Sequence, residues 1–138
     1  MDCLVIVDGA NVVGSVPDGW WRDRRGAAER LRDGLAARAG AGLPGYAEPP
    51  LELVLVVEGA ARDVASVDGV RVESAPGSGD DRMVELVAAE GAGRDCLVVT
   101  ADRGLRARVE ALGARVAGPR AVRDARGGGR RPGAVADG

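Results

Sequence analysis

Acidic side chains occur in three short motifs that lie far apart along the chain. Asp8 begins the motif Asp-Gly-Ala-Asn, which ends at Asn11. Asp80 and Asp81 are adjacent after Gly-Ser-Gly, and Asp102 follows Thr-Ala. Taken singly, each motif is also typical of a turn or a helix cap. Adjacent carboxylates repel each other unless a cation lies between them. Mg²⁺ and Mn²⁺ prefer oxygen ligands, so the motifs together indicate a site for one or two such ions.

A divalent metal ion in an acidic site is suited to chemistry on phosphate groups. It polarises phosphoryl oxygens and lowers the pKa of a bound water, so no protein nucleophile is needed. The composition supports this class by exclusion, because the chain has no His and all 19 of its basic residues are Arg. Ser/His/Asp triads, Ser-Lys dyads, Schiff bases and His-ligated zinc are therefore ruled out. Phosphodiester hydrolysis is the leading reaction class.

Strand-like and helix-like patterns alternate along the chain. Apolar residues recur at helical spacing near residues 27–35, 83–87 and 105–112, and more weakly over 60–67. This alternation predicts an α/β fold, a sandwich with a central, mainly parallel sheet of about five strands. Short apolar runs are the expected strands: Cys3 to Val7, Leu51 to Val57, Val70 to Val72, Cys96 to Thr100 and Ala114 to Val116.

The expected sheet would bring the acidic motifs together. The carboxyl ends of parallel strands meet at one edge, which is where α/β folds bind ligands. Asp8 and Asp102 each follow an expected strand, and helix capping does not predict that three acidic motifs reach one edge. The same pairing would place Cys3 near Cys96 at the opposite edge, as packing residues. Glu58 also follows an expected strand, but a solvated turn is its favoured interpretation.

Length and composition favour one globular domain. The chain has 138 residues, of which 46% are hydrophobic and 29% charged, and this length suffices for a single core. We expect the domain to span 1–118 and a mobile Arg/Gly-rich tail to span 119–138, with a surface loop at 40–50. Two cysteines without zinc-site spacing, no targeting signal and no membrane-length apolar stretch favour a cytoplasmic protein.

The ordered motifs DGAN, GSGDDRMVEL and VVTADRGL resemble the NYN group of PIN-like ribonucleases, especially bacterial YacP-like proteins. The resemblance covers about residues 3–118. It implies a PIN-like three-layer α/β/α sandwich that cleaves RNA with Mg²⁺ or Mn²⁺. Many PIN-like domains have a further acid shortly after the last motif, whereas this chain has Arg103 and Gly104 there. The family's site residues fall on Asp8, Asn11, Asp80, Asp81 and Asp102.

Arginine and tryptophan residues near the motifs are candidates for contacts with RNA. Arg82 and Arg103 each adjoin a site acid, which favours contacts with phosphate. Stacking of tryptophan on bases, with arginine on phosphate, suits single-stranded RNA. Packing of one tryptophan at a helix start is the alternative. The run that could serve in this way contains Trp20, Trp21, Arg22 and Arg24.

The sequence therefore predicts a metal-dependent endoribonuclease that acts on RNA. Asp8, Asp80, Asp81 and Asp102 would form the metal and water-activating shell, and Asn11 would orient it. Two other hypotheses stay open. One is a non-catalytic module that binds RNA or the ribosome, which the lack of a further late acid favours. The other is a phosphatase or nucleotide hydrolase that uses the same metal site on a small substrate.

Overall fold

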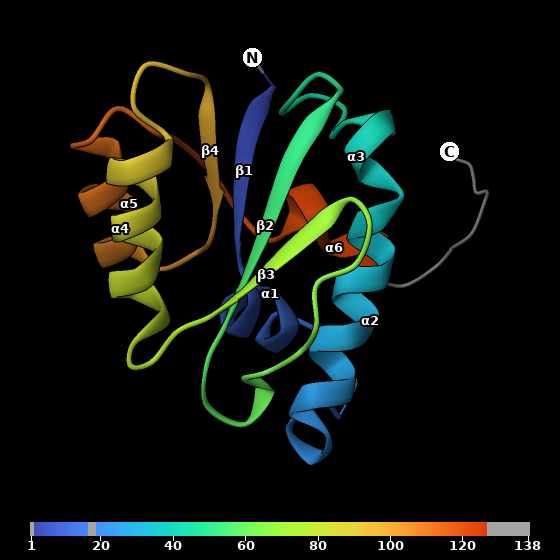
Figure 1. Cartoon of the computed structure of the whole chain (residues 1–138). Helices are drawn as coiled ribbons and strands as arrows, with labels where there is room; N and C mark the ends of the chain where they lie inside the picture. Colours follow the sequence, from blue (N-terminus) through green and yellow to red (C-terminus); the bar gives the residue numbers. More distant parts are fainter. Residues whose placement is uncertain (1, 17–18, 127–138) are drawn as a thin grey trace.

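Five apolar segments pair side by side into one parallel sheet in the computed structural model, which describes residues 2–16 and 19–126. The strand order is β3-β2-β1-β4-β5, and every neighbouring pair is parallel (Figure 1). Continuous burial of β1 explains its unbroken apolar run, because a central parallel strand is covered on both faces. The strands are β1 (Cys3–Asp8), β2 (Leu51–Val57), β3 (Val70–Ser74), β4 (Cys96–Val99) and β5 (Arg115–Ala117).

Helices cover both faces of the sheet, which confirms the three-layer α/β/α sandwich. Alternate residues of β1 point into two separate cores, with Val5 and Val7 on one face and Leu4 and Ile6 on the other. Helices α1, α2 and α6 lie against the first core, and α4 and α5 lie against the second (Figure 1). The helical elements are α1 (Gly9–Gly14), η1 (Trp20–Arg22), α2 (Arg24–Ala36), α3 (Arg38–Ala41), η2 (Gly59–Ala61), α4 (Gly79–Glu90), α5 (Arg103–Glu110) and α6 (Arg120–Arg126).

The order of the strands reverses between β1 and β4. From β1 the chain passes to β2 and β3 on one side, and α4 then carries it back to β4 and β5 on the other side. In open α/β sheets, a reversal of this kind leaves a crevice outside the carboxyl ends of the two central strands, where ligands bind. The first and third acidic motifs follow these two strands.

The weak helix expected over residues 60–67 is wrong. Only η2 forms there, and the chain then becomes extended at Arg62 and left-handed at Asp63, whose φ is 71°. Val67 pairs with Val70 in an isolated bridge, and the hydroxyl of Ser66 accepts the N–H of Val72 at 2.8 Å. These contacts fold the segment back onto the edge of β3, so its apolar residues mark a turn rather than a helix face.

Two further segments differ from the sequence analysis. The expected surface loop at 40–50 begins inside α3, and its Leu43 is fully buried and paired with Ala47. Helix α6 lies in the segment assigned to the tail, and its Val122 is only 1% exposed in the core beneath α2. The rest of that segment, residues 127–138, lies outside the described residues.

The two cysteines lie on neighbouring strands but on opposite faces of the sheet. Cys3 packs in the core beneath α2, and Cys96 packs in the core beneath α4 and α5. Burial raises the pKa of each thiol to about 11. Both residues therefore serve as packing residues, as expected. No described helix is long and apolar enough to cross a membrane.

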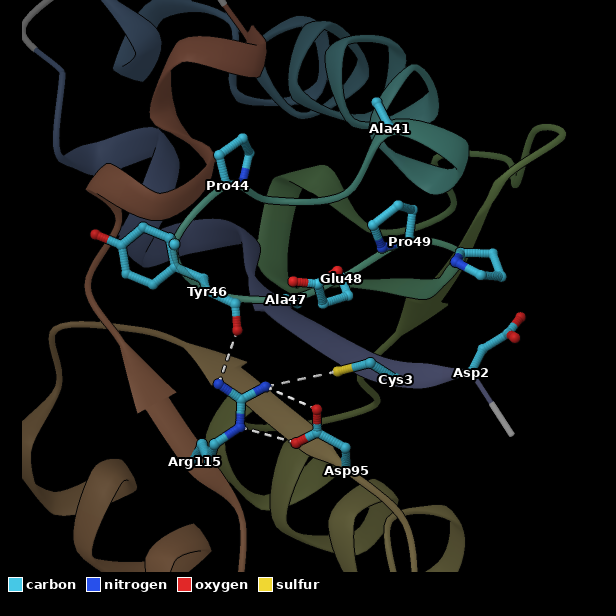
Figure 2. Close-up of a pocket in the computed structure, with 12 residues that line it drawn as sticks. Asp2, Cys3, Ala41, Pro44, Tyr46, Ala47, Glu48, Pro49, Asp95 and Arg115 are labelled. Atoms are coloured by element: carbon cyan, nitrogen blue, oxygen red, sulfur yellow. Dashed lines mark hydrogen bonds and ion pairs between the residues drawn. The ribbon is translucent and has the colours of Figure 1, made fainter.

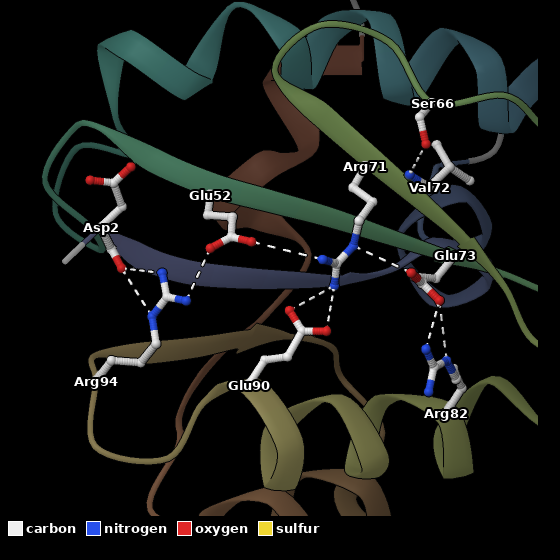
Figure 3. Close-up of polar contacts among 9 residues, drawn as sticks. All are labelled: Asp2, Glu52, Ser66, Arg71, Val72, Glu73, Arg82, Glu90 and Arg94. Atoms are coloured by element: carbon white, nitrogen blue, oxygen red, sulfur yellow. Dashed lines mark hydrogen bonds and ion pairs between the residues drawn. The ribbon is translucent and has the colours of Figure 1, made fainter.

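A network of ion pairs covers the edge of the sheet beside α4 (Figure 3). Arg71 of β3 lies 2.9 Å from Glu90 at the end of α4 and 3.3 Å from Glu73. Glu73 also pairs with Arg82 of α4 at 2.7 Å. Because these side chains are partly exposed, each pair contributes little to stability, but together they fix the direction of Arg82.

Candidate acidic active site

Asp8 is a buried carboxylate held at both of its oxygens. It ends β1 and is only 6% exposed. Its Oδ1 accepts the N–H of Asn11 at 3.3 Å, which caps α1, and its Oδ2 accepts the hydroxyl of Thr100 at 2.8 Å. Gly9 makes this turn possible, because a Cβ there would lie 2.6 Å from the carbonyl oxygen of Val56. The side chain of Asp8 therefore has one fixed orientation.

The turns after β1 and β4 are joined by hydrogen bonds. The side-chain oxygen of Asn11 accepts the N–H of Ala101 at 2.9 Å. The hydroxyl of Thr100 accepts the N–H of Asp102 at 3.1 Å while it donates to Asp8. Asp102 in turn caps α5 by accepting the N–H of Leu105 at 3.0 Å. The structure therefore brings the first and third acidic motifs together, as the strand ends predict.

The start of α4 separates its two adjacent aspartates. Ser78 caps the helix by accepting the N–H of Asp81 at 3.3 Å, so the pattern predicted for a cap does form one. Asp80 is partly buried, whereas the side chain of Asp81 is 67% exposed and pairs with Arg108 of α5 at 3.1 Å. Asp80 therefore lies where the charges of Asp102 and Glu58 act on it, and Asp81 lies on the outside beside Arg108.

Glu58 is half-buried and bonded to the start of α4, so our preference for a solvated turn is wrong. It follows β2 directly, and its Oε1 accepts the N–H of Gly79 at the start of α4 at 2.7 Å. A Cβ on Gly79 would lie 3.3 Å from this carboxylate, so the glycine leaves room for it. The sequence signal was the position of Glu58 at the end of a central strand.

The charges of neighbouring carboxylates act on Asp8 and Asp80, and we call this group the acidic cluster: Asp8, Glu58, Asp80 and Asp102. Burial raises the pKa of Asp8, and the charges of Asp80 and Glu58 raise it further, against hydrogen bonds from Thr100 and the Asn11 N–H. Burial also raises the pKa of Asp80, with the charges of Asp102 and Glu58 adding to it and Arg108 opposing it. Mutual repulsion is thus built into the cluster.

The chemistry of the acidic cluster fits a hard divalent cation. Its donors are carboxylate oxygens, and an amide and a hydroxyl lie beside them, which are the ligand types that Mg²⁺ and Mn²⁺ prefer. A cation would also relieve the repulsion that raises the pKa of Asp8 and Asp80. Among the described residues, however, no three acidic side chains are close enough as they stand to hold a metal ion.

The arginines expected to contact phosphate lie in different surroundings. Arg82 is not brought to the acidic cluster, since its guanidinium pairs with Glu73 and, at 3.2 Å, with Glu85. Arg103 is exposed at the start of α5, next to Asp102. Position in the sequence did not distinguish the two, because ion pairing depends on which face of a helix meets its neighbour.

The two tryptophans differ in their contacts. Trp20 is partly buried and packs against the core, whereas Trp21 is 54% exposed. Their rings meet edge to face, with centroids 6.1 Å apart. The guanidinium of Arg24 lies 5.3 Å from the centroid of Trp20, and that of Arg22 lies 5.6 Å from Trp21. Packing at the helix start, which was the alternative, therefore describes Trp20.

Sequence reasoning missed residues that support the site. Thr100, which holds both Asp8 and the turn at Asp102, had one signal, as the sole threonine of the chain beside an acidic motif. Arg106 donates from Nε to the carbonyl of Thr100 at 2.9 Å. Arg108 pairs with Asp81. Both arginines project from α5, and nothing in their sequence spacing separates them from solvated residues.

A cavity of about 970 Å³ lies at the end of the sheet opposite to the acidic cluster (Figure 2). It is bounded by residues 44–50 and by the start of β1. Within it, Arg115 pairs with both oxygens of Asp95, at 2.8 and 2.9 Å, and donates to the carbonyl of Tyr46. Because Asp8 is at the opposite end of β1, this cavity is separate from the acidic cluster.

A solved structure shares this architecture. The crystal structure of Rae1 (YacP) from Bacillus subtilis, a tryptophan-to-leucine mutant, matches with a TM-score of 0.62 at 18% identity, covering 85% of this chain and 69% of that chain. The chain has the fold of Rae1. The similarity to Rae1 confirms, at the level of the fold, the expected resemblance to YacP-like proteins and the PIN-like arrangement. No family model and no curated protein matches the chain.

Proposed function

We propose that this protein is a metal-dependent endoribonuclease that hydrolyses RNA phosphodiester bonds at the acidic cluster. The observation that carries the proposal is a buried carboxylate, Asp8, at the carboxyl end of the central strand, with Asp80 and Glu58 near enough to raise its pKa. The crevice at the strand reversal is where such folds bind ligands. The fold shared with Rae1 and the motifs that resemble YacP-like ribonucleases support the same reaction class.

Asp8 and Asp102, which Thr100 joins, are the residues that would hold Mg²⁺ or Mn²⁺, an ion that commonly takes only one or two carboxylates and keeps several waters. Bound there, the cation would lower the pKa of a coordinated water and neutralise charge on the phosphate. The protein supplies the positioning. Thr100 and the backbone N–H of Asn11 fix the two oxygens of Asp8, so the carboxylate need not reorient when substrate arrives.

The remaining side chains have roles in moving a proton and binding phosphate. Asp80, whose pKa burial and neighbouring charges raise, is suited to accept the proton of the attacking water. As the oxygen of that water bonds to phosphorus, the bond from phosphorus to the leaving oxygen breaks. Asn11 is anchored through its Oδ1, so its amide NH₂ is a positioned donor for a phosphate oxygen. The exposed Arg103 adds positive charge beside Asp102.

The first test is cleavage of a labelled mixed-sequence single-stranded RNA with Mn²⁺, with Mg²⁺ and with EDTA. We expect internal cuts with either metal and none with EDTA. Asp8→Asn should lower the rate at least about 100-fold, as loss of a group that acts in the transition state does. Glu110→Gln removes the same charge from an exposed position of α5 outside the cluster and should cleave like the wild type.

Two results would contradict this proposal. Equal cleavage by the wild type and Asp8→Asn would show that the cuts arise elsewhere, for instance from a contaminant. RNA binding unaffected by EDTA, without cleavage in either metal, would favour the module that binds RNA or the ribosome. Release of phosphate from nucleotides, with RNA left intact, would favour the phosphatase hypothesis.

A further inference from the structure

A second cavity, of about 410 Å³, opens beside the acidic cluster, between the start of α2 and the end of β2. We call it the Trp20 cleft. Its apolar lining includes Val13, Trp20 and Val57, and Glu58 closes it on the side of the acidic cluster. Since the charge of Glu58 also acts on Asp8 and Asp80, the cleft and the cluster share a wall.

The aromatic wall of the cleft is held in place. Trp20 packs against the core on one side, and the guanidinium of Arg24, which also lines the cleft, lies over its ring. Trp21 is not part of the lining and projects outward. The guanidinium of Arg24 thus forms a stack with the ring, and a base can extend this stack because planar nitrogen heterocycles stack on guanidinium planes as well as on aromatic rings.

We propose that the Trp20 cleft binds one unpaired nucleobase of the RNA strand whose phosphate lies at the acidic cluster. The volume of the cleft is near the lower end of the range for small-ligand pockets, about 300–1,000 Å³, which suits one nucleotide unit rather than a duplex. Its apolar lining disfavours a bare anion, and Arg24 is placed for the charge of the backbone beside the base. This proposal rests on the proposed function, because RNA is the ligand in both.

The composition of the chain makes a direct test possible. Trp20 and Trp21 are its only two tryptophans, so Trp21→Leu leaves Trp20 as the sole source of tryptophan fluorescence. Ribonucleoside 5′-monophosphates, titrated in EDTA, should quench the fluorescence of Trp21→Leu in a saturable way. The matched variant Trp20→Leu, which retains only the exposed ring, should show no saturable change. Ribose 5-phosphate, which lacks a base, should have no effect on either protein.

A second variant keeps the test independent of any folding defect in Trp20→Leu. Ala10 is an exposed residue of α1 that lines the cleft, so Ala10→Leu fills the opening without entering the core. We expect about tenfold weaker binding of the monophosphates, the scale of one base–aromatic stack. On RNA, KM should rise by a similar factor with little change in kcat. Ala88→Leu, the same change at an exposed position of α4, is the control.

Several outcomes would overturn the proposal. Equal quenching of the two single-tryptophan variants, equal binding of ribose 5-phosphate, or unchanged binding to Ala10→Leu would each exclude a base in this cleft. If Ala10→Leu changes the sedimentation of the ligand-free protein but not the binding of the monophosphates, the occupant of the cleft is a second copy of the chain. Because the titrations need neither metal nor cleavage, quenching of Trp20 without RNA cleavage would reject only the proposed nuclease. Cleavage without quenching would reject only the cleft.

Discussion

Asp8 carries its negative charge where a charge is costly. Burial and the charges of Asp80 and Glu58 raise its pKa, and two hydrogen bonds offset this only in part. A neutral residue at this position would relieve the repulsion. Carboxylates in such surroundings are typical of functional sites, where stability is given up for chemistry.

Because the charge of Asp8 destabilises the folded protein, the effect of Asp8→Asn on stability should depend on pH. Because the folded pKa of Asp8 is raised, the folded protein holds this proton more tightly than the unfolded chain does. The protein therefore becomes less stable as the pH rises from the unfolded pKa of Asp8 through its higher folded pKa. Thermal unfolding should give similar midpoints for wild type and variant near pH 4 and a higher midpoint for the variant near pH 7. A lower midpoint for Asp8→Asn at neutral pH would mean that the lost hydrogen bonds outweigh the charge.

Thr100 acts through the two acids that it joins. Thr100→Val keeps the shape of the side chain but removes the donor to Asp8 and the acceptor for the N–H of Asp102. We expect a loss of about 1–3 kcal/mol in the free energy of unfolding, measured in urea, and a slower cleavage of RNA. Thr100→Ser should recover most of both. Full activity of Thr100→Val would show that Thr100 does not position the acids of the site.

Helix α4 presents its two N-terminal aspartates in different directions. Its cap at Ser78 and the bond from Gly79 to Glu58 fix the first turn, which leaves Asp80 near the other acids of the cluster and Asp81 beside Arg108. Asp80 and Asp81 are therefore adjacent in the sequence but differ in their surroundings.

The matched pair Asp80→Asn and Asp81→Asn tests this difference. We expect the first to slow RNA cleavage about 100-fold, as loss of a proton acceptor does, and the second to retain most of the activity. The exposed pair of Asp81 with Arg108 should also contribute no more than about 1 kcal/mol to stability. Single-turnover cleavage measures both variants. Equal losses of rate would show that both carboxylates act in the reaction.

The elements could be predicted where burial dictates the sequence. The central strands β1, β2 and β4 agree with their apolar runs to within a residue, because strands covered on both faces exclude polar residues. Helix α6 was missed because Val122 is the one deeply buried side chain among residues 120–123, the part of the helix whose burial is described, so its sequence resembles that of an exposed segment. The turn after η2 was mistaken for a helix because spacing does not reveal a left-handed residue such as Asp63.

The candidate site could be predicted in outline for a related reason. The strand ends place Asp8 and Asp102 together whatever the side chains beyond them do. The directions of Glu58, Asp81 and Arg82 depend on contacts with a neighbouring helix or strand. Such contacts leave no periodic signal in the sequence.

At the scale of the whole molecule, α6 closes the layer that α2 forms over the sheet. Val122 packs in the same core as the first helices and the odd-numbered residues of β1. The protein core thus extends beyond residue 118, where the sequence analysis placed the end of the domain. Removing the contact should weaken the whole layer rather than α6 alone.

Val122→Ala tests the contribution of α6. The loss of two buried methyl groups should cost about 2 kcal/mol in the free energy of unfolding. Arg120→Ala, at an exposed position of the same helix, should change stability by less than about 0.5 kcal/mol. Urea unfolding measures both. An equal effect of the two substitutions would indicate that α6 does not contribute to the core in solution.

The hydrogen bond between Thr100 and Asp8 joins residues 92 positions apart. A growing polypeptide exposes Asp8 well before Thr100. At about 5–20 residues per second, roughly 5–20 s separate the two. During that interval the β1 turn exists without β4, α4 has no finished sheet to pack against, and the crevice is incomplete. The nascent chain thus acquires its acidic cluster only after the segment that contains Thr100 and Asp102 has been synthesised.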